Sequence, residues 1–279
     1  MPTFTSADGT TLAYHVTGTG EPLVVLPGGP MRASAYLGDL GGLGAHRTLY
    51  RLDLRGTGDS GTPADPASYR CDRQVADVEA LRERLGLDQI DLLAHSAGGD
   101  LATLYAASHP ERVSRLVLIT PALYSLGVEF TGEQRQEAVA LRADEPWYAD
   151  AAAGFANILA GSPTDEDWRA VVPFTYGRWD AAAQAHAGAG AGQRNLAAAE
   201  LYYAVEAADP PGVRAALSAL GAPVLVLAGE LDTGPRPATA REGAALFPKG
   251  ESAVQPGAAH YPWLDDADAF TRLVAGFLR

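Results

Sequence analysis

Short apolar runs recur along the chain, and they constrain its fold more than any other feature. Stretches with a helical spacing of apolar residues lie between successive runs. Strands this rich in apolar residues are buried on both faces, which is typical of a parallel sheet covered by helices on each side. The runs are Pro22–Leu26, Thr48–Leu54, Ile90–Ala94, Val113–Ile119 and Pro223–Ala228.

The segments between these runs predict helices. The stretch 75–85 has apolar residues at positions 75, 78, 81 and 85 and ends before Gly86, as an amphipathic helix with a glycine stop does. Near the N-terminus, Asp8 and Gly9 predict the turn of a β-hairpin. The fold class that follows is α/β, with a mostly parallel central sheet flanked by helices. Further elements are predicted at 101–108, 211–220 and 238–246 (helices), at 251–255 (a weaker strand) and at the end of the chain (a helix).

The alternation of strands and helices stops after Pro121 and resumes near residue 210. The intervening segment is rich in alanine, carries scattered aromatic residues and has no convincing buried strand. We therefore expect an α/β core formed by residues 1–125 and 210–279, interrupted by a helical cap at 126–209. A glycine-alanine run at 187–192 within this cap is interpreted as a hinge or a loop.

The charge balance restricts the classes of partner. A formal net charge of −13 and a sequence pI of about 4.8 disfavour binding to nucleic acid or to an anionic membrane surface. The start of the chain lacks the basic and apolar regions of a signal peptide, and the single cysteine, Cys71, fits a reducing cytoplasm. Without metal-ligand spacings or a phosphate-binding glycine motif, we expect a small-molecule substrate, no metal and no cofactor. Homo-oligomerisation stays open.

A serine follows directly on the predicted strand that ends at Ala94. In the segment AHSAG at 94–98, the residues two positions before and after Ser96 are small. A tight strand-to-helix turn requires such neighbours, and it lifts the serine hydroxyl above the edge of the sheet. The segment therefore predicts a nucleophile elbow of the type G-x-S-x-G, with Ser96 as the nucleophile. His95 would point away from this edge and is interpreted as structural.

A serine hydroxyl needs a base, and the base needs an acid to orient it. His260 lies on a glycine-containing loop after the weaker strand, and Asp232 follows the strand that ends at residue 228. The chain order of serine, acid and histidine is the one found in enzymes with this type of elbow. We expect Ser96, Asp232 and His260 to form a catalytic triad, with Glu230 as the alternative acid.

Acyl transfer also needs N–H donors for the oxygen that becomes negative. The amide of Ala97, which directly follows the serine at a helix start, is one predicted donor. The loop PGGP at 27–30 offers the other, and Gly29 is the predicted donor because glycine lets the backbone turn its amide toward the site. Pro27 and Pro30 have no N–H to offer.

These residues together resemble those of the α/β-hydrolase fold family. DLRGTGDSG at 53–61 resembles that family's loop after the preceding strand. Within the family, LPGGP at 26–30 and DVEALRERLGL at 77–87 are similar to the proline iminopeptidase-like branch, although Pro27 and Met31 depart from its H-G-G-P-G loop. The resemblance implies a serine hydrolase that acts through an acyl-enzyme on a small peptide or amide with a free N-terminus.

The same branch has a cap motif, E-N-H-Y, whose glutamate binds the amino group of the substrate. ELYY at 200–203 is similar to it, so the resemblance implies substrate-binding roles for Glu200 and Tyr203, with Glu206 as a second candidate for the acid. Gly28 and Trp263 complete the expected substrate-binding set. The alternative is that both glutamates are exposed on a cap helix, as most glutamates are.

Two other functions stay open on sequence grounds. An esterase, lactonase or thioesterase acting on a small metabolite would use the same serine and oxyanion donors without an amine-binding Glu200. A non-catalytic ligand receptor of the same fold would need no intact triad. The presence of Ser96, Asp232 and His260 therefore favours an enzyme over a receptor.

Overall fold

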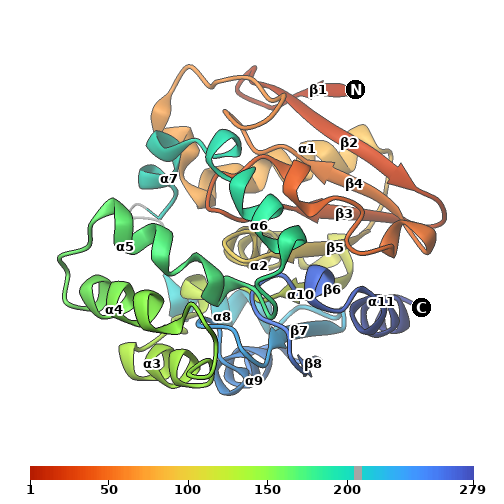
Figure 1. The fold of residues 1–279 in the computed structure, drawn as a ribbon. Coiled ribbons are helices and arrows are strands. Elements are labelled where there is room, and N and C mark those ends of the chain that lie inside the picture. Colours follow the sequence, from red (N-terminus) through yellow and green to blue (C-terminus); the bar gives the residue numbers. More distant parts are fainter. Residues whose placement is uncertain (204–208) are drawn as a thin grey trace.

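A sheet of eight strands forms the centre of the computed structural model, which describes residues 1–203 and 209–279 (Figure 1). The strands are β1 (Thr3–Thr5), β2 (Thr11–Gly18), β3 (Pro22–Leu26), β4 (Thr48–Leu52), β5 (Ile90–His95), β6 (Val113–Ile119), β7 (Val224–Gly229) and β8 (Gly250–Gln255). Their order in the sheet is β1-β2-β4-β3-β5-β6-β7-β8. β2 pairs antiparallel with β1 and β4, and the other pairings are parallel. The predicted α/β class with a mostly parallel sheet is confirmed.

Successive residues of the central strands pack on opposite faces of the sheet. In β3, Val24 and Leu26 belong to one hydrophobic cluster, whereas Leu23 and Val25 belong to the other, and all four side chains are fully buried. This alternation is the period of two that a strand imposes on its side chains. Burying a side chain of this size stabilises the fold by about 1.5–3 kcal/mol, so the apolar runs place their strands in the middle of the sheet.

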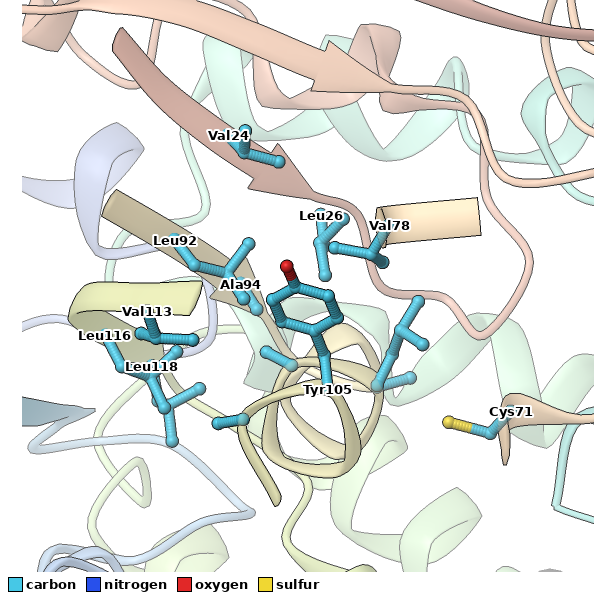
Figure 2. Close-up of a cluster of buried hydrophobic side chains, with 14 of the residues drawn as sticks. Val24, Leu26, Cys71, Val78, Leu92, Ala94, Tyr105, Val113, Leu116 and Leu118 are labelled. Carbon is cyan, nitrogen blue, oxygen red and sulfur yellow. The ribbon is translucent and has the colours of Figure 1, made fainter. Parts of the chain in front are cut away.

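Helices cover both faces of this sheet. One face is covered by α1 (Val75–Arg84), α2 (Gly98–Ser108), α8 (Pro210–Leu217) and α9 (Pro237–Ala244). The other face is covered by α10 (Pro262–Asp265) and α11 (Ala267–Phe277). Figure 2 shows the ring of Tyr105 on α2 pointing toward Leu26 and Ala94, and its hydroxyl donates a hydrogen bond to Glu79 of α1 at 2.8 Å. Among the described residues, no helix is both long and apolar enough to cross a membrane.

The segment between β6 and α8 is helical in its described part, which holds no named strand. Its helices are α3 (Gly132–Ala140), α4 (Tyr148–Leu159), α5 (Asp165–Ala170), α6 (Ala181–Gly188) and α7 (Leu196–Tyr202). Figure 1 shows α3, α4 and α5 grouped together, in green. Val139 of α3, Ala151 and Phe155 of α4, and Phe174 of the following 3-10 turn form a small separate hydrophobic cluster. The division of the chain into a core and a cap at 126–209 stays a prediction.

The glycine-alanine run at 187–192 does not form an open loop. Its first residues end α6, and a 3-10 turn at Ala191–Gln193 follows. The high helix propensity of alanine favours α6, which ends at Gly188, and a turn at 189–190 leads to the 3-10 turn. Immediately afterwards the chain bonds to the core, because Ala33 N–H donates to the carbonyl of Gln193 at 2.8 Å and Asn195 N–H donates to the carbonyl of Met31 at 3.0 Å.

Candidate active site

Ser96 lies in the tight turn between β5 and α2. Its backbone φ is +53°, in the left-handed region that costs an L-residue roughly 1 kcal/mol or more. The turn leaves no room beside Gly98, where a Cβ would lie 2.6 Å from the carbonyl oxygen of Pro27. α2 begins at this glycine, earlier than the predicted start at Leu101, because the low helix propensity of glycine hides the start of the helix in the sequence.

Ser96, His260 and Asp232 form one hydrogen-bonded line. The Oγ of Ser96 lies 2.9 Å from Nε2 of His260, and Nδ1 of His260 lies 2.9 Å from Oδ2 of Asp232. The three residues follow the carboxyl ends of β5, β8 and β7, and such ends meet at one edge of a parallel sheet. Asp232 is 1% exposed, so its charge acts on the imidazole through a medium of low dielectric constant. The fold thus brings together the three residues that the sequence singled out.

Glu230, the alternative acid, makes a different contact. Its side chain is exposed, and Oε2 accepts the N–H of Gly257 at 2.8 Å, which ties the loop after β7 to the loop that carries His260. The second oxygen of Asp232, Oδ1, accepts the N–H of Gly234 at 3.0 Å. The carboxylate that faces the His260 ring is therefore Asp232.

The two predicted oxyanion donors, Ala97 and Gly29, are available for a ligand. Neither amide donates a hydrogen bond to any described residue. Ala97 borders the cavity beside Ser96, whereas Gly29 lies next to the lining residue Pro30 and is not itself in the lining. Gly28 differs from its expected role, because its N–H donates to the Tyr36 hydroxyl at 2.7 Å and it does not line the cavity. A Cβ at Gly28 would lie 2.8 Å from the Cβ of Ser96, so this glycine permits the loop to approach the elbow.

A chain of hydrogen bonds behind the site involves Tyr36, which the sequence did not indicate. The Tyr36 hydroxyl lies 2.7 Å from Nδ1 of His95, and Nε2 of His95 lies 2.9 Å from the carbonyl oxygen of His260. Since a carbonyl can only accept, Nε2 of His95 carries the proton and Nδ1 accepts from the Tyr36 hydroxyl. The chain connects the loop of Gly28, the elbow and the loop of His260, so His95 has a structural role that positions the site.

Protonation of His95 should destabilise the fold. Burial, reinforced by the nearby His260, lowers the pKa of His95 well below its ordinary value of 6.5. Because this pKa is lower in the folded than in the unfolded state, stability is present above pH 6.5 and is lost as the pH falls below it. We therefore expect the free energy of unfolding to decrease as the pH falls below 6.5, because the unfolded chain then binds a proton at His95 that the folded chain does not.

Chemical denaturation at pH 7 and pH 5 measures this effect. The variant His95→Asn has no titrating ring at this position, so its unfolding free energy should fall less between the two pH values than that of the wild type. His46→Asn removes an exposed imidazole and serves as the control. An equal fall in the wild type and in His95→Asn would contradict the prediction.

A cavity of about 270 Å³ opens beside Ser96, near the lower end of the range for small-molecule sites. The Ser96 and His260 side chains border it from the core, and aromatic side chains and Arg135 border it from the segment after β6. A larger cavity of about 570 Å³ lies at the opposite edge of the sheet, and its lining includes neither Ser96 nor His260. The lining residues beside Ser96 are Pro30, Ser96, Ala97, Thr120, Ala122, Tyr124, Phe130, Arg135, Thr175, Tyr203, Asp232, Thr233, Gly234 and His260.

The described candidates for substrate binding occupy different places. Tyr203 lines the cavity, and its ring packs edge-on against Tyr124 with the ring centres 5.4 Å apart. Trp263 is buried outside the lining and packs edge-on against His95 at 4.9 Å, so it supports the site from behind. Glu200 is exposed on α7 and does not line the cavity. This placement agrees with the alternative interpretation, in which Glu200 is a surface residue of a cap helix. Glu206 lies outside the described residues.

One group of described residues has the composition of a metal site. Ligand atoms of His15, Asp53 and Asp59 lie within 4.8 Å of one another. The oxygens of Asp53 already accept the N–H groups of Ser34 at 2.8 Å and Asp59 at 3.0 Å, and Oδ2 lies 2.8 Å from Nε2 of His15. These hydrogen bonds connect the loop after β4 to β2 and to the segment of Ser34, so the cluster has a structural explanation. None of its members lines the cavity beside Ser96.

The sequence matches the model of a known family. The family model described as the alpha/beta hydrolase fold matches residues 21–267. The chain therefore belongs to the α/β-hydrolase fold family. Its relatives and structural neighbours include esterases and a proline iminopeptidase.

Individual relatives cover the chain to different extents. Proline iminopeptidase from Heyndrickxia coagulans is 34% identical over 110 residues, which is 39% of this chain and 38% of that protein. (Lyso)-N-acylphosphatidylethanolamine lipase from Mus musculus is 40% identical over 103 residues, 36% of this chain and 30% of that protein. These matches thus span 30% to 38% of the length of the relatives. The solved structure of an esterase from Rhodococcus sp. ECU1013 covers 99% of this chain and 98% of its own, with 29% identity and a TM-score of 0.70.

Proposed function

We propose that the chain is a serine hydrolase that works through an acyl-enzyme, with Ser96 as nucleophile, His260 as general base and Asp232 as the orienting acid. The observation that carries the proposal is the line of two 2.9 Å contacts from Ser96 through His260 to Asp232 at the edge of a cavity. Membership of the hydrolase family and the 29% identity to the Rhodococcus esterase over nearly the whole chain support it.

In the first half of the reaction, Oγ of Ser96 attacks the substrate carbonyl carbon while Nε2 of His260 takes the hydroxyl proton. Asp232 holds Nδ1–H of His260 and stabilises the imidazolium. The carbonyl oxygen becomes negative and accepts hydrogen bonds from the amides of Ala97 and Gly29. His260 then gives its proton to the leaving group as that bond breaks. In the second half, water attacks the acyl-enzyme in the same way, which releases the acid and restores Ser96.

Small carboxylic esters and lactones are the substrate class that fits this cavity best. An exopeptidase needs a carboxylate in the cavity to pair with the ammonium group of its substrate. The carboxylate among the described lining residues is Asp232, and its two oxygens already face His260 and the N–H of Gly234. Because Glu200 is exposed elsewhere, no described acid is left for an ammonium group.

An aminopeptidase is the second candidate, and the partial match to the Heyndrickxia coagulans proline iminopeptidase favours it. Two substrate sets separate the candidates: 4-nitrophenyl esters of graded chain length, and aminoacyl 4-nitroanilides led by proline. We expect rapid release from the short esters and only background release from the nitroanilides, measured by absorbance. Ser96→Ala should abolish the ester activity, and Glu200→Gln should leave it unchanged because Glu200 lies outside the cavity lining.

Other outcomes have clear meanings. Efficient cleavage of prolyl nitroanilide that depends on Ser96 and falls tenfold or more in Glu200→Gln would establish the aminopeptidase instead, at a cost typical of a lost charged hydrogen bond of about 1.5–3 kcal/mol. If neither substrate set is turned over and a fluorophosphonate does not label Ser96, the serine hydrolase proposal fails.

A further inference from the structure

Arg135 is the cavity residue that the proposed mechanism does not use. It belongs to α3 and lines the same cavity as Ser96. Its side chain is half-buried, and its Nε atom is enclosed by protein without a hydrogen-bond acceptor. None of the ion pairs found among the described residues, such as those of Arg47 with Asp91 and Arg142 with Glu145, involves Arg135. Arg135 therefore presents an uncompensated positive charge to the cavity.

An uncompensated arginine is not explained by a shortage of acids. The chain has 34 acidic and 21 basic residues. Some buried arginines of the fold have carboxylate partners, as Arg47 has Asp91 at 2.8 Å and Arg55 has Asp77. Arg32 instead bonds to Gln193 and Tyr261, outside the cavity beside Ser96. Taking a charge out of water without a partner is costly, and an anion supplied by a ligand would offset that cost. Arg135 combines an unbonded Nε with a place in the lining of the Ser96 cavity, so a ligand in that cavity could supply its anionic partner.

Aromatic side chains hold Arg135 near the reacting groups. The guanidinium carbon lies 5.9 Å from the ring centre of Phe130, which is a cation–π distance. Phe130 packs against the loop of Asp232, because a Cβ at Gly234 would lie 2.9 Å from Cδ2 of that ring. The ring of Tyr124 lies beside Phe130, with the ring centres 5.6 Å apart. A ligand that extends from Ser96 to Arg135 therefore passes an aromatic wall and ends at a positive charge.

We propose that Arg135 binds a carboxylate of the substrate, so that the preferred substrates are small esters or lactones with a carboxylate remote from the reacting carbonyl. The inference rests on the proposed function, because it names the substrate class for the Ser96 site. A guanidinium can bind both oxygens of a carboxylate through two parallel N–H···O bonds, and such charge-assisted bonds are about twice as strong as neutral ones. The same charge repels a substrate ammonium group, which separates this specificity from that of an aminopeptidase.

The test compares two 4-nitrophenyl esters with acyl chains of equal length, the neutral valerate and the monoester of glutaric acid, which ends in a carboxylate. Initial rates give kcat and KM for the wild type, for Arg135→Gln and for Arg241→Gln. Arg241 is exposed on α9 and outside the cavity lining, so its variant is the matched control for the loss of one positive charge.

We expect the wild type to have the higher kcat/KM for the glutarate ester. Arg135→Gln should lower the ratio of kcat/KM for glutarate over valerate by about tenfold to a hundredfold, mainly through a higher KM, because a charged hydrogen-bond pair is lost. Arg241→Gln should leave the ratio unchanged. A ratio that is the same in the wild type and in Arg135→Gln would overturn the inference while leaving the serine hydrolase intact.

Failure of the proposed function would give a different result. If neither ester is hydrolysed and a fluorophosphonate does not label Ser96, the nucleophile assignment falls. Calorimetry with glutarate itself, on Ser96→Ala and on the double variant Ser96→Ala/Arg135→Gln, then still tests the binding site. A loss of affinity of about tenfold or more in the double variant supports a carboxylate site at Arg135. Equal affinity, or no binding to either protein, overturns it.

Discussion

Replacing Ser96 with alanine should lower kcat on the best ester substrate by about 10⁴- to 10⁶-fold. The Ser96 hydroxyl lies 2.9 Å from Nε2 of His260 and borders the cavity, and no other group is placed to form the acyl bond in the proposed mechanism. The activity that remains in Ser96→Ala would come from substrate binding and from the oxyanion donors, because their backbone N–H groups are unchanged by the substitution. Release of 4-nitrophenol measures the effect.

Two controls make this result specific. Ser252→Ala removes an exposed hydroxyl from β8 and should leave the activity of the enzyme unchanged. A fluorophosphonate should add one group per chain to the wild type and to Ser252→Ala, but none to Ser96→Ala, as measured by intact mass. A Ser96→Ala variant that keeps more than about 1% of the activity would contradict the nucleophile assignment.

Replacing Asp232 with asparagine should lower kcat by about 10³- to 10⁴-fold with little change in KM. The buried carboxylate accepts Nδ1–H of His260 at 2.9 Å, which leaves Nε2 free to take the serine proton. An asparagine amide can donate to Nδ1 instead, and the imidazole then carries its proton on Nε2, where it cannot act as a base. Steady-state kinetics on the same ester measure the loss.

Glu230→Gln is the matched control for the acid. It removes a negative charge two residues from Asp232, but its side chain is exposed and bonds only to the N–H of Gly257 in the described structure. We expect its kcat to stay within about threefold of the wild type, as for a surface substitution worth less than about 0.5 kcal/mol. A larger loss in Glu230→Gln than in Asp232→Asn would exchange the roles of the two acids.

Much of the core could be predicted because its physical signals are local. The apolar runs at 22–26 and 113–119 became β3 and β6 with the same bounds, since a strand that is buried on both faces requires apolar residues in succession. The turn at Ser96 was visible because steric crowding admits only small residues around it. The predicted start of α2 was wrong. Gly98 begins this helix despite its low helix propensity, because a larger residue there would clash with the backbone of Pro27.

The cavity wall was harder to predict, because it depends on contacts between distant segments. Glu200 was chosen from a motif, yet its helix turns that side chain to the surface. Arg135 and Tyr36 carry no sequence signal of their own: one is an arginine on a polar helix, and the other is a tyrosine in a short 3-10 turn. Their partners became known only once the chain was folded.

The order of residues was sufficient to predict the buried strands and the tight turn at Ser96, because the period of a strand and the crowding of a turn act along the backbone. It also indicated that Asp232 and His260 lie at the same edge of the sheet, because the carboxyl ends of parallel strands meet there. The residues that surround a substrate required the folded chain. Packing between segments far apart in sequence decides which side chains of a cap helix face the cavity. It also decides whether a charged side chain there has a partner of opposite charge, and no local sequence pattern encodes either property.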